Sequence, residues 1–328
     1  MSDFDKFSAS KVKSVIAPCK GPPPRLVIFC SLNKGEPEVF KSERLLKHSE
    51  HRFGESASSF NNCMYLMQSV MKAPPGKSAS EDDIKELVKL TLMRQLFAGD
   101  QERRLLIMML ETHRKSHFIT RVKFVSGLQD LGAGTQQVER ALALLKELRD
   151  VSDVVFDLGR MVAMDLFIGN YDRFDYNGNV ANIGNIFFKV NKKGELRLVA
   201  LDSFMDGSSH ANMLSDPNLG GREMSSGSQG LKFKALIDNT QEQMDHAWAV
   251  SRALNAELIE LLKGSELARK DQEGEIFPVQ KVASSIMGGM QLAMAELGKA
   301  IKQKRGSNKN PLVQGVITRY ERLLRGGF

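Results

Sequence analysis

The sequence predicts an α+β fold with a small, β-rich N-terminal lobe and a larger, mostly helical C-terminal lobe. Three observations predict this arrangement. Short runs of β-branched and aromatic residues occupy much of residues 11–31. Apolar residues recur at helical spacing through residues 136–168 and again toward the end of the chain. A single strand-turn-strand pattern, over residues 186–202, interrupts the helical part.

The N-terminal lobe is expected to begin with a β-hairpin. The strand-like runs KSVIAP and RLVIFCS lie on either side of CKGPPP, whose glycine and prolines break any strand between them. From Glu36 the pattern EPEVFKSERLLKH predicts a short helix with its apolar residues near one side. Residues 72–80 are expected to form a loop, and Ser80, followed by acidic residues, to begin a further helix.

A connector is expected after this lobe. The stretch FITRVKFVSGLQDL, residues 118–131, is strand-like up to Val125 and then reaches a turn at Ser126 and Gly127. The predicted domains are therefore a small lobe over residues 1–117 and a large lobe over residues 118–328, with the connector at the start of the large lobe.

Composition excludes several classes of protein. The chain has 328 residues, 42% of them hydrophobic, so it can bury a core without disulfides or structural metal. Its three cysteines have no metal-ligand spacing and indicate a reducing compartment. The N-terminus is charged where a signal peptide would be apolar, and no apolar run is long enough to cross a bilayer. We expect a cytoplasmic protein, or an effector secreted into a host cytosol.

The net charge of +7 suits partners that carry phosphate groups or acidic surfaces. The basic residues are spread along the chain, and no aromatic-basic motif of the known nucleic-acid readers occurs. Nucleic acid is therefore not expected as a partner. The sequence does not indicate an oligomeric state.

Polar residues gather at both ends of the predicted hairpin. The segment GNYDRFDYNGNVANIGNIFF, residues 169–188, joins an apolar helix to the first strand and contains Asp172 and Asn185. Asp202 closes the second strand in VALDSF. A hairpin brings its two ends together, and carboxylate and amide oxygens are ligands that Mg²⁺ accepts beside substrate phosphates. Phosphoryl transfer needs such ligands and a base that orients the acceptor hydroxyl, so these three residues together predict a phosphoryl-transfer site.

These residues also resemble a known family. The stretch DLFIGNYDRFDYNGNVANIGNIFF followed by LVALDS is similar to the catalytic core of actin-fragmin kinase and its relatives, in the atypical branch of the protein-kinase-like fold. Type II phosphatidylinositol 4-kinases and HipA-type kinases share a related core. The resemblance covers roughly residues 160–206 and implies a two-lobed, protein-kinase-like fold.

The resemblance implies a role for each polar residue. Asp172 falls on the catalytic-loop aspartate, Asn185 on the metal-binding asparagine of that loop, and Asp202 on the metal aspartate of the DFG motif. The alternatives to Asn185 are Asn177, at the interval of ordinary kinase loops, and Asn182; Asn185 is preferred because it directly precedes the first strand.

Two flanking residues of this loop are also open to assignment. Arg173 is expected to form a structural ion pair rather than to bind phosphate. Asp165 either orients the loop or is an exposed or capping carboxylate.

The resemblance extends to the small lobe, where EVFKSERLL is similar to the helix that carries the ion-pair glutamate, here Glu38. Kinases hold the nucleotide phosphates with a lysine on the third strand. When RLVIFCSLNK is read as that strand, it offers no lysine before Lys34. Glu38, Lys34 and Lys13 are therefore the predicted nucleotide-binding residues, with Lys11, Lys20 and Arg25 as other candidates for the cation.

These residues and the resemblance predict an ATP-dependent phosphotransferase that uses Mg²⁺ or Mn²⁺. ATP with its metal is expected between the lobes. The resemblance implies a protein Ser/Thr hydroxyl as acceptor, with actin as the specific candidate. The alternatives are a pseudokinase or interaction module, a kinase-fold enzyme that transfers another group such as AMP, and a lipid kinase, because the basic charge suits an anionic membrane surface.

Overall fold

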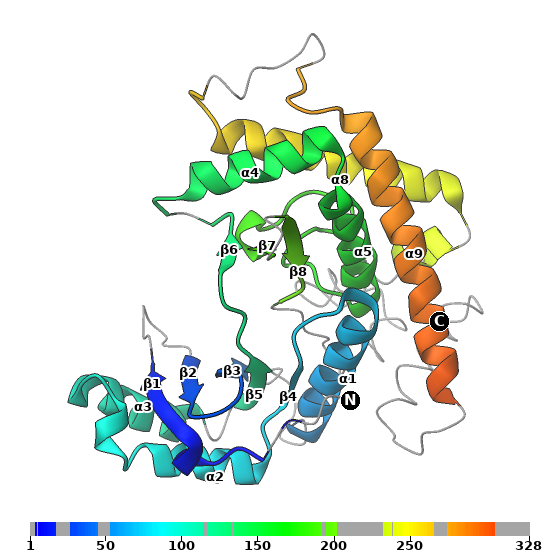
Figure 1. Cartoon of the computed structure of the whole chain (residues 1–328). Helices are drawn as coiled ribbons and strands as arrows, with labels where there is room; N and C mark the ends of the chain where they lie inside the picture. The colour runs from blue at the N-terminus through cyan, green and yellow to red at the C-terminus, as the bar shows by residue number, and fades with distance from the viewer. Residues whose placement is uncertain are drawn as a thin grey trace. The chain divides into compact units, whose positions relative to one another are not determined.

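The computed structural model describes residues 4, 6–17, 27–44, 53–113, 117–132, 134–191, 195–201, 232–237, 239–265 and 274–305 (Figure 1). The chain forms two compact units: residues 1–65 with 74–126, and residues 66–73 with 127–328. Each unit is described by itself. The predicted domain division at residue 117 stays a prediction.

The first unit contains a five-stranded antiparallel sheet in the order β1-β2-β3-β5-β4. The strands are β1 (Val12–Ile16), β2 (Val27–Leu32), β3 (Glu38–Arg44), β4 (Gly76–Ser78) and β5 (His117–Lys123). The predicted N-terminal hairpin is confirmed, because β1 pairs with β2 from Val12 opposite Leu32 to Ile16 opposite Phe29.

The register divides this sheet into two faces, because residues opposite each other in an antiparallel pair point to the same side and neighbours along a strand alternate. One side, here called the packed face, carries the fully buried Ile28, Cys30 and Phe40. Helices α2 (Glu81–Leu90) and α3 (Asp100–His113) supply Leu87, Leu90, Leu106 and Leu110 to the same core.

The other side is here called the Lys41 face. It carries Phe29, Val39, Lys41 and Val122, all half-buried. Helix α1 (Phe53–Met71) reaches this side of the sheet, because a Cβ added at Gly76 would come within 2.8 Å of Met64 and 3.2 Å of Val122. The two faces therefore have different chemistry. The packed face has an apolar core with the buried Glu38–Arg121 ion pair at its edge, and the other face is a half-buried apolar surface with a lysine.

Residues 36–48 were predicted to form a helix, and this prediction is wrong over the described part, where residues 38–44 are the strand β3. The strand alternates buried and half-buried residues from Glu38 to Ser42. Its period of two was hidden because Glu38 and Ser42, which look like surface residues, are buried on the packed face. The predicted loop over residues 72–80 also contains a short strand, β4.

The predicted start of α2 is confirmed. The Ser80 side chain accepts a hydrogen bond from the Asp83 backbone N–H at 3.1 Å, and the Ser80 N–H donates to the Asp83 carboxylate at 3.0 Å. In this capping box, two backbone N–H groups at the N-terminus of the helix each donate to a side-chain oxygen.

The second unit is mostly helical. Its helices include α4 (Gln137–Asp150), α5 (Asp153–Ile168), α8 (Thr240–Leu261) and α9 (Val279–Arg305). Helix α5 is buried along most of its length. It lies directly against α9, since a Cβ added at Gly159 would stand 2.0 Å from the Ile286 carbonyl oxygen and one at Gly289 would stand 2.0 Å from that of Phe156.

A three-stranded sheet completes this unit, in the order β6-β7-β8. Strand β6 (Leu128–Asp130) pairs with β7 (Phe187–Val190), and β7 pairs with β8 (Leu196–Val199). The predicted hairpin is confirmed, and so is the predicted α+β class with a β-rich N-terminal part and a mostly helical C-terminal part. No helix among the described residues is long and apolar enough to span a membrane.

Candidate functional site

The loop after α5 is held by a buried ion pair. Gly169 ends the helix with a positive φ of 76°, a conformation that glycine adopts without steric cost. The chain then turns back so that Arg173 Nε and Nη2 donate to the two carboxylate oxygens of Asp165 at 2.8 and 2.5 Å. Asn170 Nδ2 donates to Asp165 Oδ1 at 3.1 Å. The expected structural ion pair of Arg173 is thus confirmed, and Asp165 orients the loop.

Arg173 also connects this loop to the end of the hairpin. Its Nη1 donates to the carbonyl oxygen of Leu201 at 2.6 Å, and the Arg173 side chain has no exposed surface. Leu201 immediately precedes Asp202, one of the two predicted metal ligands. Asp202 itself lies outside the described residues. The loop and the chain that leads into Asp202 are therefore attached to the same guanidinium group.

Asp172 and Asn185 lie close together although thirteen residues separate them. Asn185 Nδ2 donates to the backbone carbonyl of Asp172 at 3.4 Å. The Asp172 N–H donates to Asn170 Oδ1 at 3.2 Å, which holds the backbone of the predicted catalytic residue. Its half-buried carboxylate makes no hydrogen bond or ion pair with any described residue. The carboxylate thus remains able to accept a hydrogen bond from a bound hydroxyl group.

The two alternative asparagines have local roles in turns. The exposed Asn177 donates its N–H to Asp175 Oδ1 at 2.9 Å. The Asn182 side chain accepts a hydrogen bond from the Gly184 N–H at 3.0 Å and caps the short helix η3 (Ile183–Asn185). Asn185 remains the predicted metal ligand, and its hydrogen bond to the Asp172 backbone is the contact that places it at this loop.

Burial and charge act in opposite directions on Asp165. Complete burial raises the pKa of this carboxyl group, while the Arg173 guanidinium and the Asn170 amide favour its charged form. The ionised state of Asp165 therefore depends on Arg173, and the position of Arg173 depends on Asp165.

In the first unit the structure identifies a residue that sequence reasoning missed. The third strand of the chain is β3, and Lys41 lies on it, in V-F-K, on the half-buried Lys41 face. The earlier strand RLVIFCSLNK, read as the third, is the second. A lysine on the third strand is the kinase pattern, and an apolar-x-Lys run after a hairpin was the signal that could have found it.

None of the three predicted nucleotide-binding residues takes the place of Lys41 on the Lys41 face. Glu38 is on β3 and not on a helix; it points to the packed face, where Arg121 and Lys123 bind its carboxylate. Lys34 follows β2 and is exposed, and Lys13 is exposed on β1. Of the further candidates for the cation, Lys11 is exposed just before β1, and residues 20 and 25 lie outside the described residues.

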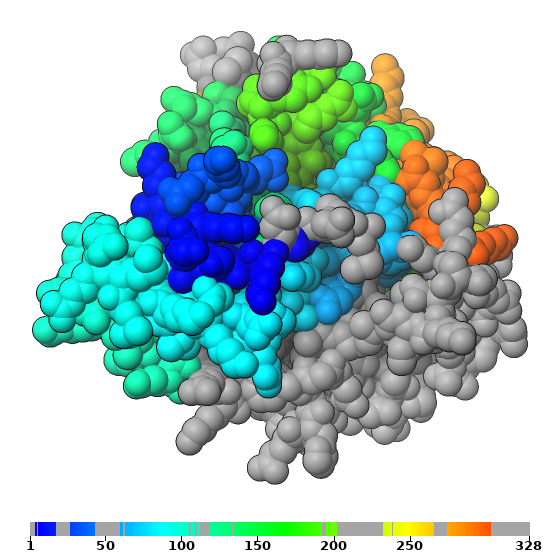
Figure 2. Space-filling view, turned by 60° about the horizontal axis from the view of Figure 1, so that its bottom comes forward, coloured from blue at the N-terminus to red at the C-terminus, as the bar shows by residue number. Residues whose placement is uncertain are grey.

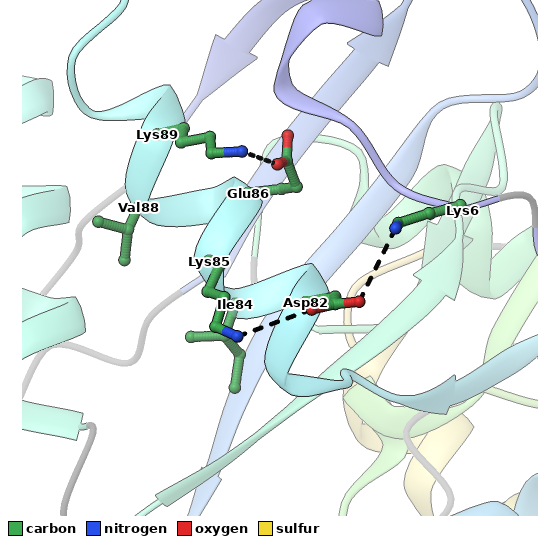
Figure 3. Close-up of a pocket in the computed structure, with 7 residues that line it drawn as sticks. All are labelled: Lys6, Asp82, Ile84, Lys85, Glu86, Val88 and Lys89. Atoms are coloured by element: carbon green, nitrogen blue, oxygen red, sulfur yellow. Dashed lines mark hydrogen bonds and ion pairs between the residues drawn. The ribbon is translucent and has the colours of Figure 1, made fainter.

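A surface hollow of about 530 Å³ lies beside α2 in the first unit (Figure 3). It is lined by Lys6 from the N-terminal segment and by residues of α2. Lys6 and Lys85 each lie 3.8 Å from Asp82, and Lys89 pairs with Glu86. These exposed pairs are typical of a solvated helix surface, and none of the predicted site residues lies there.

No group of three or more His, Cys, Asp or Glu side chains able to hold a metal ion occurs within the described ranges. The predicted metal pair includes Asp202, which lies outside them, so the pair stays a prediction.

No family model and no curated protein matches the chain. Among solved structures, the Golgi casein kinase with Mn/ADP bound is 12% identical, with a TM-score of 0.33 over 90% of this chain and 74% of that one. The Rio2 kinase-ADP/Mg²⁺-phosphoaspartate complex from Chaetomium thermophilum is 11% identical, with a TM-score of 0.35 over 97% and 74%. Hydra Fam20 with sugar is 12% identical, with a TM-score of 0.34 over 91% and 88%.

Two of these three neighbours are named as kinases. At such low identities and TM-scores, the likeness transfers no residue role, ligand or substrate to this chain. The actin-fragmin kinase family is not among these neighbours.

Proposed function

We propose that the chain is an ATP-dependent phosphotransferase in which Asp172 orients the acceptor hydroxyl group. The observation that carries this proposal is the anchored loop of the second unit. Its Asp172 carboxylate has no partner among the described residues, Asn185 donates to the Asp172 backbone carbonyl, and Arg173 holds the carbonyl of Leu201, the residue before the predicted ligand Asp202. A base held in this way can accept the proton of a hydroxyl as it attacks a phosphoryl group.

The first unit supplies a cation for the nucleotide phosphates. Lys41 and Val39 lie on the same half-buried face, and an apolar surface with one lysine suits a purine base and its phosphates. Helix α1 follows β3 along the chain and reaches the same face of the sheet, beside Gly76 and Val122.

The donor types fit a divalent cation. An asparagine oxygen and a carboxylate, Asn185 and Asp202, are oxygen ligands of the kind that Mg²⁺ or Mn²⁺ accepts together with phosphate oxygens. When bound, the cation would neutralise charge that develops on the transferred phosphoryl group. The residues of this chain hold the loop backbone, position Asp172 and provide Lys41.

The acceptor is proposed to be a Ser or Thr hydroxyl of a protein, with actin as the specific candidate implied by the resemblance around residues 160–206. We place the protein in the cytoplasm, where the buried thiols of Cys30 and Cys63 would stay reduced. A phosphoinositide acceptor is tested beside the protein substrates.

The test is transfer of label from γ-labelled ATP with Mg²⁺ to candidate protein and lipid acceptors. Asp172→Asn keeps the shape of the side chain but removes the base, so we expect a loss of rate of about 10²-fold or more. Lys41→Met should weaken ATP binding. Asn177→Ala, in an exposed turn of the same loop, is the control and should keep wild-type activity. Equal activity of Asp172→Asn and the control would contradict the proposal.

A second candidate function has support in the sequence of the β1–β2 connection. Its CKGPPP segment is not a glycine-rich phosphate loop, which favours a nucleotide-free interaction module. The module is supported if the chain does not bind ATP and transfers label from neither γ- nor α-labelled ATP to any acceptor. Label from α-labelled ATP alone would support transfer of AMP.

A further inference from the structure

A second hollow, of about 400 Å³, lies within the first unit and is strongly basic. Its charged lining consists of five cations and one carboxylate: Lys6, Lys11, Lys34, Arg121, Lys123 and Glu38. The N-terminal segment that supplies Lys6 and Lys11 lies against α2, where the Ala9 N–H donates to Glu86 at 2.8 Å; the space-filling view shows this segment in blue beside the cyan residues (Figure 2). The volume is within the range of small-molecule sites.

The deeper part of this hollow is electrically compensated. Glu38 is 1% exposed and accepts hydrogen bonds from Arg121 at 2.5 and 2.9 Å and from Lys123 at 2.8 Å. Arg121 also donates to Asp83 at 3.2 Å. The Glu38 charge is thus neutralised, so it does not oppose the entry of an anion. These interactions also fix Arg121 and Lys123 in place.

The outer part carries charge that is not compensated. Lys11 and Lys34 are exposed, and neither makes an ion pair or a side-chain hydrogen bond within the described part of the chain. The two lysines belong to adjacent segments, because the Asn33 N–H donates to the Lys11 carbonyl oxygen at 2.8 Å. Two neighbouring free cations attract an anion with more than one charge.

Neutral polar groups line the space beside these lysines. The Ser8 and Ser10 hydroxyls share a hydrogen bond of 2.9 Å and can turn from it to donate to a ligand, and Asn33 precedes Lys34 in the lining. Gly35 has a positive φ of 96°, and a Cβ there would meet nothing within 4 Å, so the turn leaves room at the mouth. Lysines with hydroxyl and amide donors are the groups that bind phosphate oxygens.

We propose that this hollow binds a diphosphate group, either free or at the end of a nucleotide. Lys11 and Lys34 bind the phosphoryl oxygens, and the Ser8, Ser10 and Asn33 side chains donate hydrogen bonds to them. Two linked phosphoryl groups match the pair of lysines, because each lysine can bind one group.

This site is separate from the nucleotide surface proposed above. Glu38 and Arg121 point to the packed side of the sheet, and Lys41 points to the opposite side, as the β3–β5 register requires. The proposal does not depend on phosphotransferase activity, because an inactive chain would keep the same hollow.

The test is isothermal titration of the full chain with pyrophosphate, at low salt and without divalent metal. Lys11→Ala/Lys34→Ala should weaken binding by about tenfold or more, because two uncompensated charges are lost. Lys299→Ala/Lys302→Ala, which removes two exposed lysines of α9, is the control with the same change of net charge. Lys41→Met is the control for the other face. Both controls should bind as the wild type does.

Three results would overturn the proposal: no binding of pyrophosphate by the folded wild type, equal affinity of Lys11→Ala/Lys34→Ala and its charge-matched control, or loss of binding in Lys41→Met. Titration of Lys41→Met with ADP distinguishes the two sources of the diphosphate. Competition between ADP and pyrophosphate in that variant indicates the end of a nucleotide, and binding of pyrophosphate alone indicates the free ion.

Discussion

At the scale of single residues, Arg173 connects three parts of the second unit. Its guanidinium group binds Asp165 at the end of α5 and the Leu201 carbonyl after β8, and its backbone carbonyl accepts a hydrogen bond from the Ala181 N–H at 2.9 Å. All the donors of a buried arginine need such partners, because an unpaired buried charge is costly. The orientation of the Asp172 loop therefore depends on a residue that is itself not proposed to touch substrate.

Arg173→Ala tests this dependence. The variant would leave the fully buried Asp165 carboxylate without its counter-charge, so we expect a loss of about 3–5 kcal/mol in the free energy of unfolding. Arg197→Ala, in the same unit, removes a half-buried arginine that pairs with Asp153 and Glu195 near the surface, and should cost at most about 1 kcal/mol. Urea denaturation measures the free energy of unfolding of both variants. Equal losses would show that the buried ion pair contributes no more to stability than the surface ion pairs of Arg197.

His246 gives the second unit a predicted dependence on pH. The side chain is 2% exposed, and neither ring nitrogen has a hydrogen-bond partner among the described residues. Burial, and to a lesser degree Lys232, lowers the pKa of His246 to about 4, while Asp175 and Glu242 act in the opposite direction. Because the folded pKa lies below the unfolded value of 6.5, folding favours the neutral ring.

The corresponding stability is fully present above pH 6.5 and is lost as the pH falls toward about 4. The loss from this group is expected to reach about 3 kcal/mol as an upper value. Denaturation curves at pH 7 and pH 4.5 should show a smaller difference in His246→Leu than in the wild type. An NMR titration that placed the folded pKa of His246 near 6.5 would contradict this prediction.

At the scale of secondary-structure elements, close packing of α5 on α9 depends on two glycines. Gly159 and Gly289 each face a backbone carbonyl of the opposite helix. A methyl group 2.0 Å from a carbonyl oxygen cannot be accommodated by rotating a side chain, so the helices would have to move apart. The loop that carries Asp172 begins directly after α5, so a shift of that helix would also move the start of the loop.

Two neighbouring glycines of α9 make a matched pair for this prediction. Gly289→Ala should destabilise the chain by about 1–3 kcal/mol despite the better helix propensity of alanine. In Gly288→Ala the new Cβ would stand 3.2 Å from a ring carbon of Phe156, which can shift, so the change should stay within about 1 kcal/mol. Thermal denaturation measures the stability of both variants. A similar loss of stability at the two positions would contradict the close contact between α5 and α9.

Strand β3 places two predicted or proposed site residues, Glu38 and Lys41, on opposite faces of the sheet. Glu38 and Lys41 are three residues apart, so a helix would place them on one side, whereas a strand sends them to opposite faces. The sequence pattern was compatible with a helix because two polar residues of β3 are buried. The structure thus gives the two residues different surroundings, a buried ion-pair network for Glu38 and a half-buried apolar face for Lys41.

At the scale of the whole molecule, the proposed activity requires that the folded chain binds ATP and its metal. A ligand that binds only the folded chain stabilises it by about 2.7 kcal/mol at a concentration 100 times its Kd. We therefore expect ATP with Mg²⁺ to raise the melting temperature of the wild type. Lys41→Met in the first unit and Asp202→Ala in the second should each reduce this shift, and Lys34→Ala should reduce it less than Lys41→Met does.

The comparison of Lys41→Met with Lys34→Ala is informative, because the sequence favoured Lys34 and the structure favours Lys41. A shift that is abolished by Lys34→Ala and retained in Lys41→Met would reverse the assignment of the nucleotide-binding face. An unchanged ATP affinity with metal in Asp202→Ala would reject that residue as a metal ligand.

Local signals in the sequence were sufficient for several elements. The glycine and prolines of CKGPPP mark the β1–β2 hairpin, Ser80 with its acidic neighbours marks the start of α2, and the turn after Val190 marks the β7–β8 hairpin. Each signal depends on backbone preferences of a few consecutive residues, which do not change with the rest of the fold.

The sequence alone also indicated an α+β chain, the structural ion pair of Arg173, and Asp172 with Asn185 at the mouth of one hairpin. Only the tertiary structure decided that residues 38–44 form a strand, that Lys41 and Glu38 face opposite ways, and that Arg121 and Lys123 neutralise Glu38. The reason is physical: a buried charge is tolerated only where distant residues supply its partners, and Arg121 is 83 residues away from Glu38 along the chain. No short window of sequence contains that information.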